Sequence, residues 1–259
     1  MNSEQTYDNQ PNSQPEAPAP QSFFNRLIGV YFSPGETFKE IGLAPALVAP
    51  LLILALVGAV GSWAFVDRVG IEKFTTQGIE QSVADGKITQ EQADRQLEGV
   101  RKMAPVIKAS FPLIGFVGSI LLVLVVAGLA KLVSLMFGVE NEYKPLVAVT
   151  AYAMLAVGLI ATLLLVVLIH LKPVDEIDIR NPIGSNLTAL LAVAGVKLPK
   201  FLHYLFTYVD AFYIWRVILL GIGCAAVSRR MKASTGITYA AMVATIFAVL
   251  GAAWGAIFG

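Results

Sequence analysis

The sequence predicts an all-α protein: a polytopic membrane bundle of five transmembrane helices with an extramembrane helical hairpin as an insert. Hydrophobic residues make up 56% of the 259 residues and charged residues 14%, against about 25% charged in an average soluble domain. The mean hydropathy is +0.68. The excess of hydrophobic residues lies in five long apolar stretches, each near the ~20 helical residues that a bilayer core requires. This pattern excludes a soluble globular enzyme and an intrinsically disordered protein.

The N-terminal region is expected to hold a tail and a segment at the membrane surface. Residues 1–21 are rich in Asn, Gln, Pro and Ser, which predicts a disordered tail, with a short docking segment for a partner as the alternative. No signal peptide is expected, because residues 1–25 lack Lys and Arg and contain four prolines. Apolar residues at near-helical spacing from Phe23 to Phe32 are typical of a membrane interface, and a packed lead-in to the first span is the alternative. A capping pattern at 33–36 predicts that a second helix starts there.

The first span and the insert follow in order. No charge occurs between Glu40 and Asp67, which places the first span at about 45–66. Residues 67–108 then carry seven acidic and seven basic residues. Gly86 is a plausible helix stop and Thr89 begins a capping box, so we expect two helices outside the membrane. A solvated hairpin is the first interpretation, and partner binding through its charged face is the alternative.

Four further spans follow the insert. A short polar turn makes the second and third antiparallel neighbours, and a long connection over 172–203 precedes the fourth. Within that connection residues 183–196 are apolar but too few to span, which favours an interfacial or re-entrant segment. These four spans are predicted at about 110–137, 146–171, 204–228 and 237–258. Together with the first they form one membrane domain over 22–259.

Three glycines of the last span recur at four-residue spacing: Gly251, Gly255 and Gly259. Small residues at this spacing let helix backbones approach closely in lipid, so these glycines are candidate helix-packing positions. Ordinary glycine tolerance in membrane helices is the alternative.

Five spans place the two termini on opposite sides of the membrane. With the N-terminus inside, seven Lys and Arg residues flank the inner ends and eleven lie in the outer connections. The compact cluster of Arg229, Arg230 and Lys232 supports an inner position for its short loop, whereas the raw count opposes it. Charge alone leaves the orientation undecided.

Charged residues inside the predicted fourth span are the strongest functional indication. Arg216 lies twelve residues from either end of that span, where a charge costs about 2.5–3.5 kcal/mol on insertion scales. Asp210 lies six residues earlier, about 120° away around a helix, and His203 lies seven residues before Asp210. These three residues form a candidate intramembrane polar site. The interpretations are a transport or lipid-headgroup site, an internal ion pair that fixes packing, or charges that snorkel to the surface.

No pattern in the chain predicts catalysis. The sequence contains no H-E-x-x-H, G-x-S-x-G, P-loop or G-x-G-x-x-G motif, so no catalytic residue and no cofactor are expected. Its two histidines, His170 and His203, lie at opposite ends of a long connection, and no metal is expected. The net charge of +1 gives no nucleic-acid footprint. The single cysteine, Cys224, lies in an apolar run where a thiol is normally inert.

Three segments carry a resemblance to a known family. They are FFNRLIGVYFSPGETFKEI at 23–41, EYKPLVAVTAYAMLAVGLIATLL at 142–164 and YVDAFYIWRVILLGIGCAAVSRR at 208–230. With the five-span pattern, they resemble prokaryotic Yip-domain (Ypt/Rab-interacting-protein-like) integral membrane proteins over about 23–259. The insert is covered least.

This resemblance implies a five-helix membrane bundle with a cytoplasmic N-terminus. Eukaryotic members are linked to small Rab-type GTPases and vesicle traffic, but their acidic and Gly/Pro signatures are not evident in this sequence. GTPase binding is therefore doubtful for this chain, and the family supplies no catalytic residue to carry over.

The expected function is that of a non-enzymatic multi-pass protein in the plasma (inner) membrane of a prokaryote. Its partners would be the lipid bilayer and other membrane proteins or a second copy, with membrane organisation or assembly as its work. The alternative is a small transporter, channel or lipid-translocating protein that uses Asp210 and Arg216. The deciding observation is whether these two residues line a cavity or close against each other.

Overall fold

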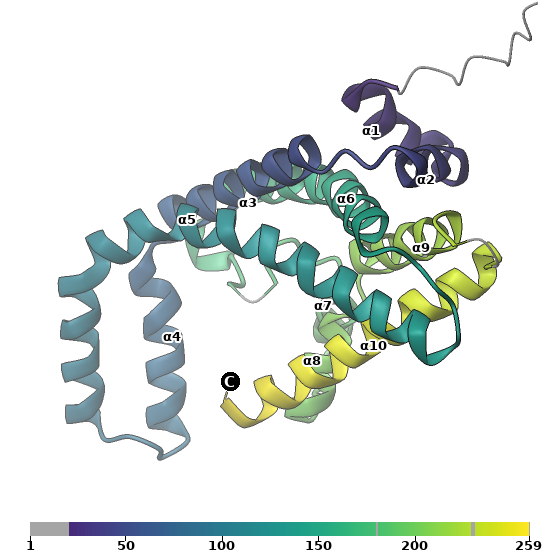
Figure 1. Ribbon diagram of the computed structural model, residues 1–259. Helices are drawn as coiled ribbons and strands as arrows, with labels where there is room; N and C mark the ends of the chain where they lie inside the picture. The colour runs from purple at the N-terminus through teal and green to yellow at the C-terminus, as the bar shows by residue number, and fades with distance from the viewer. Residues whose placement is uncertain (1–20, 180, 229–230, 259) are drawn as a thin grey trace, which may run out of the picture.

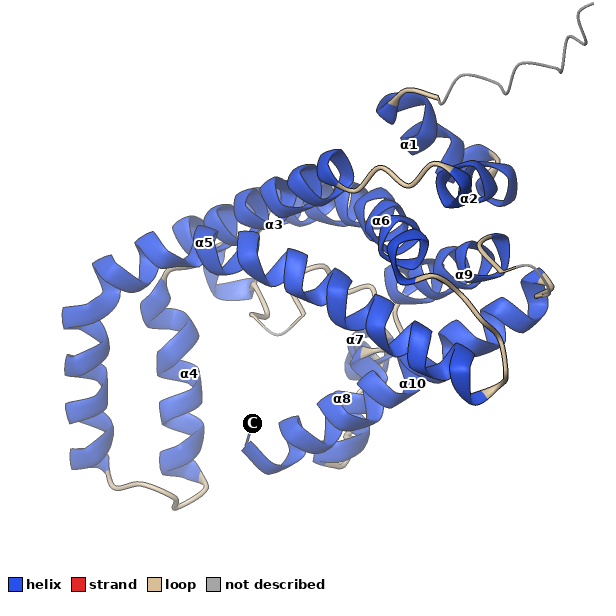
Figure 2. Ribbon diagram, viewed as in Figure 1, coloured by secondary structure: helices blue, strands red, loops and turns tan. Residues whose placement is uncertain are grey.

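The computed structural model describes residues 21–258, except residues 180, 229 and 230. The described chain folds into helices joined by turns and loops, without a β-strand (Figures 1 and 2), so the predicted all-α class is confirmed. Residues 1–20 of the expected tail lie outside the described part. In chain order the elements are α1 (Phe23–Phe32), α2 (Pro34–Leu43), α3 (Val48–Val69), α4 (Ile71–Ala84), α5 (Gln90–Met136), α6 (Tyr143–Leu171), the 3₁₀ turn η1 (Val174–Glu176), α7 (Leu187–Val193), α8 (Lys200–Thr207), α9 (Ala211–Ala226) and α10 (Ala233–Phe258).

Four of the described helices are long and apolar enough to cross a membrane. They are α3, α5, α6 and α10, whose most apolar segments have mean hydropathies between 2.0 and 2.7. Helix α9 is also apolar, but it has only 16 residues. At 1.5 Å per residue it is about 24 Å long, short of the ~30 Å hydrocarbon core.

The predicted fourth span is interrupted at Asp210. Helix α8 ends at Thr207, and α9 begins at Ala211 with Asp210 as its N-cap in an extended backbone conformation. The Asp210 carboxylate accepts hydrogen bonds from the backbone N–H groups of Phe212 at 2.9 Å and Tyr213 at 3.0 Å. Free N–H groups at a helix start favour a carboxylate. The expectation of one continuous helix over 204–228 was therefore wrong, because this acid begins a helix.

The insert forms the predicted hairpin from α4 and the first part of α5. Gly86 has a φ of +69°, which favours glycine, at the turn between them. Both hydrogen bonds of the capping box form: Gln92 N–H donates to Thr89 Oγ1 at 3.2 Å, and Thr89 N–H donates to Gln92 Oε1 at 2.9 Å. Helix α5 then turns towards the bundle (Figure 1) and contains Pro105 and Pro112, residues that kink helices.

The core surrounds the first half of α6. Every residue of α6 from Pro145 to Val157 is buried. Helices α1, α2 and α9 pack on one side of α6 through a cluster that includes Phe38, Tyr152 and Leu219. Helices α3, α5 and α9 meet it through a second cluster.

Helices α3 and α5 approach closely through a pair of glycines. A Cβ atom added at Gly115 would lie 2.4 Å from the carbonyl oxygen of Gly58, a distance that side chains do not tolerate. Glycine at both positions therefore permits the backbones to touch, as is common between helices in lipid.

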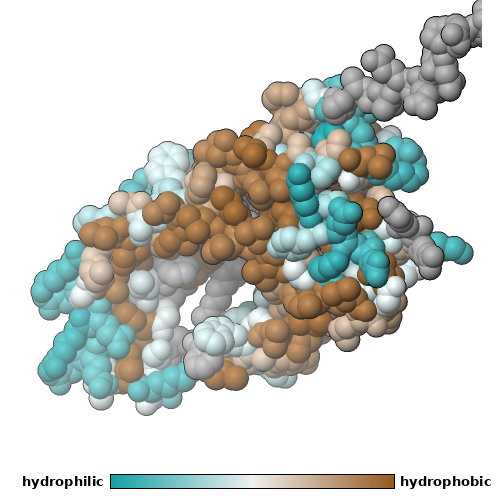
Figure 3. Space-filling model, in the orientation of Figure 1, coloured by the Kyte–Doolittle hydropathy of each residue, from teal (hydrophilic) through white to brown (hydrophobic). Residues whose placement is uncertain are grey.

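The molecule has two polar ends separated by an apolar middle. Figure 3 shows apolar side chains over the middle, and hydrophilic ones over the free end of the hairpin and near α2. At the α2 end, Lys39, Lys131, Glu140 and Ser228 line one surface hollow, so α2, the α5–α6 turn and the end of α9 lie together. At the other end the hairpin contacts the long connection, for example through an ion pair of 3.2 Å between Lys200 and Asp85.

Candidate functional site

Arg216 occupies the first half of the short helix α9. It is the sixth residue of the helix, so its Cα lies about 8 Å along the axis from the start. The continuous fourth span had placed it twelve residues from either end. The break at Asp210 removes the turns that would have preceded it, so Arg216 lies nearer one end of its helix than expected.

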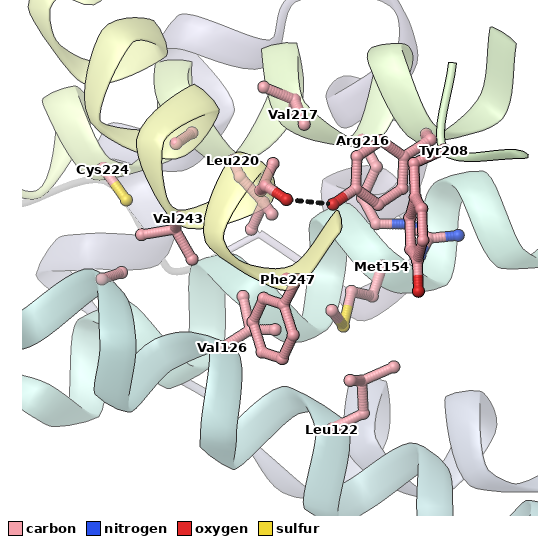
Figure 4. A pocket seen from close by; sticks show the side chains of 14 residues that line it. Leu122, Val126, Met154, Tyr208, Arg216, Val217, Leu220, Cys224, Val243 and Phe247 are labelled. Atoms are coloured by element: carbon pink, nitrogen blue, oxygen red, sulfur yellow. Dashed lines mark hydrogen bonds between the residues drawn. The ribbon is translucent and has the colours of Figure 1, made fainter. Parts of the chain in front are cut away.

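Arg216 lines a partly open cavity of about 320 Å³ between four helices. Helices α5, α6, α9 and α10 supply most of its wall, together with Tyr208 from the turn before α9. Figure 4 shows Arg216 and Tyr208 at one end and Cys224 at the other, with Leu220, Val243 and Phe247 along the way. The cavity is therefore polar at one end and apolar over the rest of its length.

One buried donor of the Arg216 guanidinium is not satisfied by the described part of the protein. Its Nε atom is buried and has no hydrogen-bond partner within the described part of the chain. The nearby Tyr213 hydroxyl donates to the Ala244 carbonyl at 2.7 Å, the dashed line in Figure 4. A buried donor without a partner is costly, about 1–3 kcal/mol and more for a charged group. The site thus holds a cation with unused hydrogen-bonding capacity.

Asp210 does not neutralise Arg216. Its carboxylate accepts from the start of α9 and from the Ser185 hydroxyl, and no ion pair joins it to Arg216 among the described residues. The internal ion pair that the sequence left open is therefore not the arrangement in the structure. Asp210 positions α9, and thereby Arg216, from outside the cavity.

A second, smaller cavity of about 160 Å³ lies on the α3 side of Arg216. Ser119 and Thr162 add hydroxyl groups to its wall, and Gly58 contributes backbone. Leu122 and Met154 line both cavities together with Arg216. The arginine therefore lies between two spaces that are separated by two flexible apolar side chains.

Of the three predicted polar-site residues, Arg216 lines these two cavities, and Asp210 and His203 are not among the described residues of their walls. His203 lies in α8, where its ring meets that of Tyr204 edge-to-face with centroids 5.6 Å apart. The backbone carbonyl of His203 accepts from the Thr188 hydroxyl at 2.8 Å. Sequence reasoning missed Tyr208 and Tyr213, whose only signal was an aromatic residue on each side of Asp210.

Two of the candidate packing glycines lie against α8 and the turn that follows it. A Cβ atom at Gly251 would come within 2.0 Å of the Tyr208 hydroxyl oxygen, and one at Gly255 within 2.7 Å of the Tyr204 ring. Gly259 lies outside the described residues. A packing role for these glycines stays a prediction, and α8 is the neighbour that it would involve.

A buried arginine, which sequence reasoning missed, joins α1 to α2. Arg26 is 2% exposed. Its Nε and Nη2 atoms donate to Glu40 Oε1 at 3.2 and 3.1 Å, and Nη1 donates to the Ala44 carbonyl at 2.9 Å. The only signal in the sequence was a basic residue within an aromatic-rich helix face. The arrangement is that of a packed structural ion pair.

The described residues contain no group of three or more His, Cys, Asp or Glu side chains placed to hold a metal ion. Arg216 cannot supply such a site, because a guanidinium only donates hydrogen bonds. What it can hold is an anionic oxygen atom.

Long apolar helices and an arginine set in an apolar cavity define a multi-pass integral membrane protein. The model of the Yip1 domain family matches residues 28–257, so the chain belongs to this family. The resemblance seen in three segments of the sequence is thereby confirmed. Neither a curated protein nor a solved structure is found to match the chain.

Proposed function

We propose that this protein is a non-enzymatic multi-pass protein of a prokaryotic plasma (inner) membrane that works by assembly with other membrane proteins. The observation that carries this proposal is the hairpin of α4 and α5, which extends away from the bundle (Figure 1) and leaves apolar side chains uncovered. Family membership supports the membrane location.

Charged side chains of the hairpin form ion pairs with one another. Arg95 pairs with Glu91, and Lys102 pairs with Glu98 at 2.7 Å, each one helical turn apart. Such exposed pairs contribute little and present a solvated face. Met103 and Val106, in contrast, are 57% and 65% exposed. Apolar surface outside the bilayer is unfavourable by about 25 cal/mol per Å², so these residues support contact with a partner.

A photo-crosslinking residue at Met103, introduced in intact cells, tests the assembly. We expect discrete adducts with membrane proteins at Met103, and a much lower yield at the control position Arg95, whose side chain is 77% exposed on the same helix. Equal yields at both positions, or adducts with lipid alone, would contradict assembly through the hairpin.

We propose that the N-terminus faces the cytoplasm. The common location of α2, the α5–α6 turn and the end of α9 supports one side for these three segments. Reporter fusions after Lys144 and after Lys232 should therefore report the cytoplasm, and one at Gly86 the outside. The reverse pattern would overturn this orientation and leave the fold intact.

The second candidate function is that of a small transporter, channel or lipid-translocating protein. The position of Arg216 between two cavities favours it, because a solute could pass an arginine that Leu122 and Met154 only partly enclose. Anion or lipid flux in proteoliposomes that disappears in Arg216→Leu but not in the hairpin control Arg95→Leu would favour this function over assembly.

A further inference from the structure

We infer that the cavity at Arg216 binds a bilayer amphiphile whose anionic head oxygen, of a carboxylate or a phosphate, pairs with the guanidinium and whose acyl chain fills the apolar end. This assigns the protein a ligand and goes beyond assembly with other membrane proteins. Four properties of the cavity support this inference: a cation with an unpaired donor, a lack of competing acids, polar groups at one end only, and access from the bilayer side.

The cation needs an acceptor that the protein does not provide. Arg216 Nε is buried without a hydrogen-bond partner among the described groups, and the Tyr213 hydroxyl already donates to Ala244. No acidic side chain lines either cavity that Arg216 touches, as far as the described chain shows. An arginine in such surroundings is matched by a carboxylate or phosphate, which its planar fork can bind through two hydrogen bonds.

The shape of the cavity fits a molecule with one polar head. Among the described residues of its wall, Arg216, Tyr208 and Tyr213 are the polar ones, and the others are apolar (Figure 4). Cys224 lies eight residues beyond Arg216, which corresponds to about 12 Å along α9. The volume of about 320 Å³ lies at the lower end of the ~300–1,000 Å³ range of ligand pockets.

Water alone fits this cavity poorly. A buried water requires two to four polar partners, and the apolar end offers none among its described lining residues. An acyl chain, in contrast, replaces empty space with contacts along Leu220, Val243 and Phe247.

The wall formed by α5 gives access from the bilayer. Leu122 lines the cavity, is 43% exposed and lies beside an exposed apolar face of α5. The neighbouring Leu121 and Val125 are 55% and 51% exposed, so this face of the helix is apolar and meets lipid. A lipid chain can therefore enter beside Leu122 without crossing water.

Three probes with the same oleoyl chain test the inference: oleate, oleoyl-lysophosphatidate and neutral monoolein. Binding to the full-length protein, delipidated in detergent, is followed by native mass spectrometry. We expect at least one anionic probe to bind about tenfold or more tighter than monoolein, as a charge-assisted hydrogen bond implies. A preference for oleate identifies a fatty acid as the source of the head group, and one for lysophosphatidate identifies a phospholipid.

Variants separate the head contact from the chain contact. Arg216→Leu should abolish the preference for the anionic probes, Arg216→Lys should keep part of it, and the exposed control Arg95→Leu should keep all of it. Ala130→Phe fills the cavity with Arg216 intact and should weaken anionic and neutral probes alike.

Two results would overturn the inference. One is equal binding of anionic and neutral probes to the unaltered protein, which would mean that the cavity takes acyl chains adventitiously. The other is an anionic preference that survives Arg216→Leu. Thermal unfolding of every variant checks its folding, and if Arg216→Leu does not fold, Arg216→Lys and Ala130→Phe still decide: unchanged binding in both rejects the site.

Discussion

Arg26 is a buried arginine and Arg216 a partly buried one with an enclosed Nε atom, and their surroundings differ in one respect that decides their roles. Arg26 directs three nitrogens to two acceptors, Glu40 Oε1 and the Ala44 carbonyl. Arg216 has a buried Nε without a partner within the described chain and faces apolar walls. The first charge is neutralised inside the protein and holds two helices together. The second retains its binding capacity for another molecule.

The contrast follows from where the acids lie along the chain. Glu40 is fourteen residues from Arg26, across the tight junction between α1 and α2, so the fold brings it to the arginine. Asp210 is six residues from Arg216 but is held by the free N–H groups at the start of α9. Proximity in sequence therefore did not decide which arginine is paired.

The largest expected effect comes from removing the paired arginine. Arg26→Leu should lower the free energy of unfolding by about 3 kcal/mol, because it strands the partly buried carboxylate of Glu40. Arg26→Leu combined with Glu40→Leu should recover part of this loss. The measurement is unfolding in mixed detergent micelles, with Lys39→Leu as the control at an exposed site. An Arg26→Leu protein as stable as that control would remove the distinction between the two arginines.

The next effect in size concerns Asp210, the acidic residue six positions before Arg216. Asp210→Ala should cost about 1–2 kcal/mol through the lost N-cap of α9, whereas Asp210→Asn should stay near the unaltered protein, because asparagine also caps helices well. An ion pair with Arg216 would require the charge, so Asn would then be as harmful as Ala. Thermal stability of the two variants in one detergent distinguishes these cases.

The hairpin supplies a reference without a buried charge. Thr89→Ala should cost about 1 kcal/mol of local helix stability, since it removes one half of the capping box. Hydrogen–deuterium exchange should show faster exchange in the first turns of α5 and no change in α9. Complete lack of protection over residues 90–103 in the unaltered protein would mean that the hairpin helix is not stable.

The smallest expected effect belongs to the unpaired arginine. Arg216→Leu should change the unfolding free energy of the delipidated protein by less than about 0.5 kcal/mol or raise it, because its buried Nε has no hydrogen-bond partner among the described residues. Its effect should add to that of Asp210→Asn within about 0.5 kcal/mol. A loss as large as that of Arg26→Leu, or a strong coupling in this cycle, would show that Arg216 has a protein partner after all.

The sequence predicted the hairpin and misjudged the fourth span for related reasons. Gly86 and Thr89 are local signals, and the structure uses them at those positions. Asp210 carries a local signal too, since aspartate is a good N-cap, but a charge within a long apolar run equally indicates a charge inside a continuous span. Deciding between the two interpretations requires knowing where α8 ends, which depends on the contacts of α8 with its neighbours.

Composition and apolar length by themselves determined that this is a helical multi-pass membrane protein, because bilayer crossing depends on how many consecutive residues avoid charge. The Yip-domain resemblance was also present in the sequence, in segments that the Yip1 domain match over 28–257 includes almost entirely. Only the tertiary structure decided that Glu40 reaches Arg26 and that Arg216 faces a cavity. Residues as far apart in the sequence as Leu122 and Phe247 line that cavity. Whether a buried charge is paired depends on such distant neighbours, and no local pattern records them.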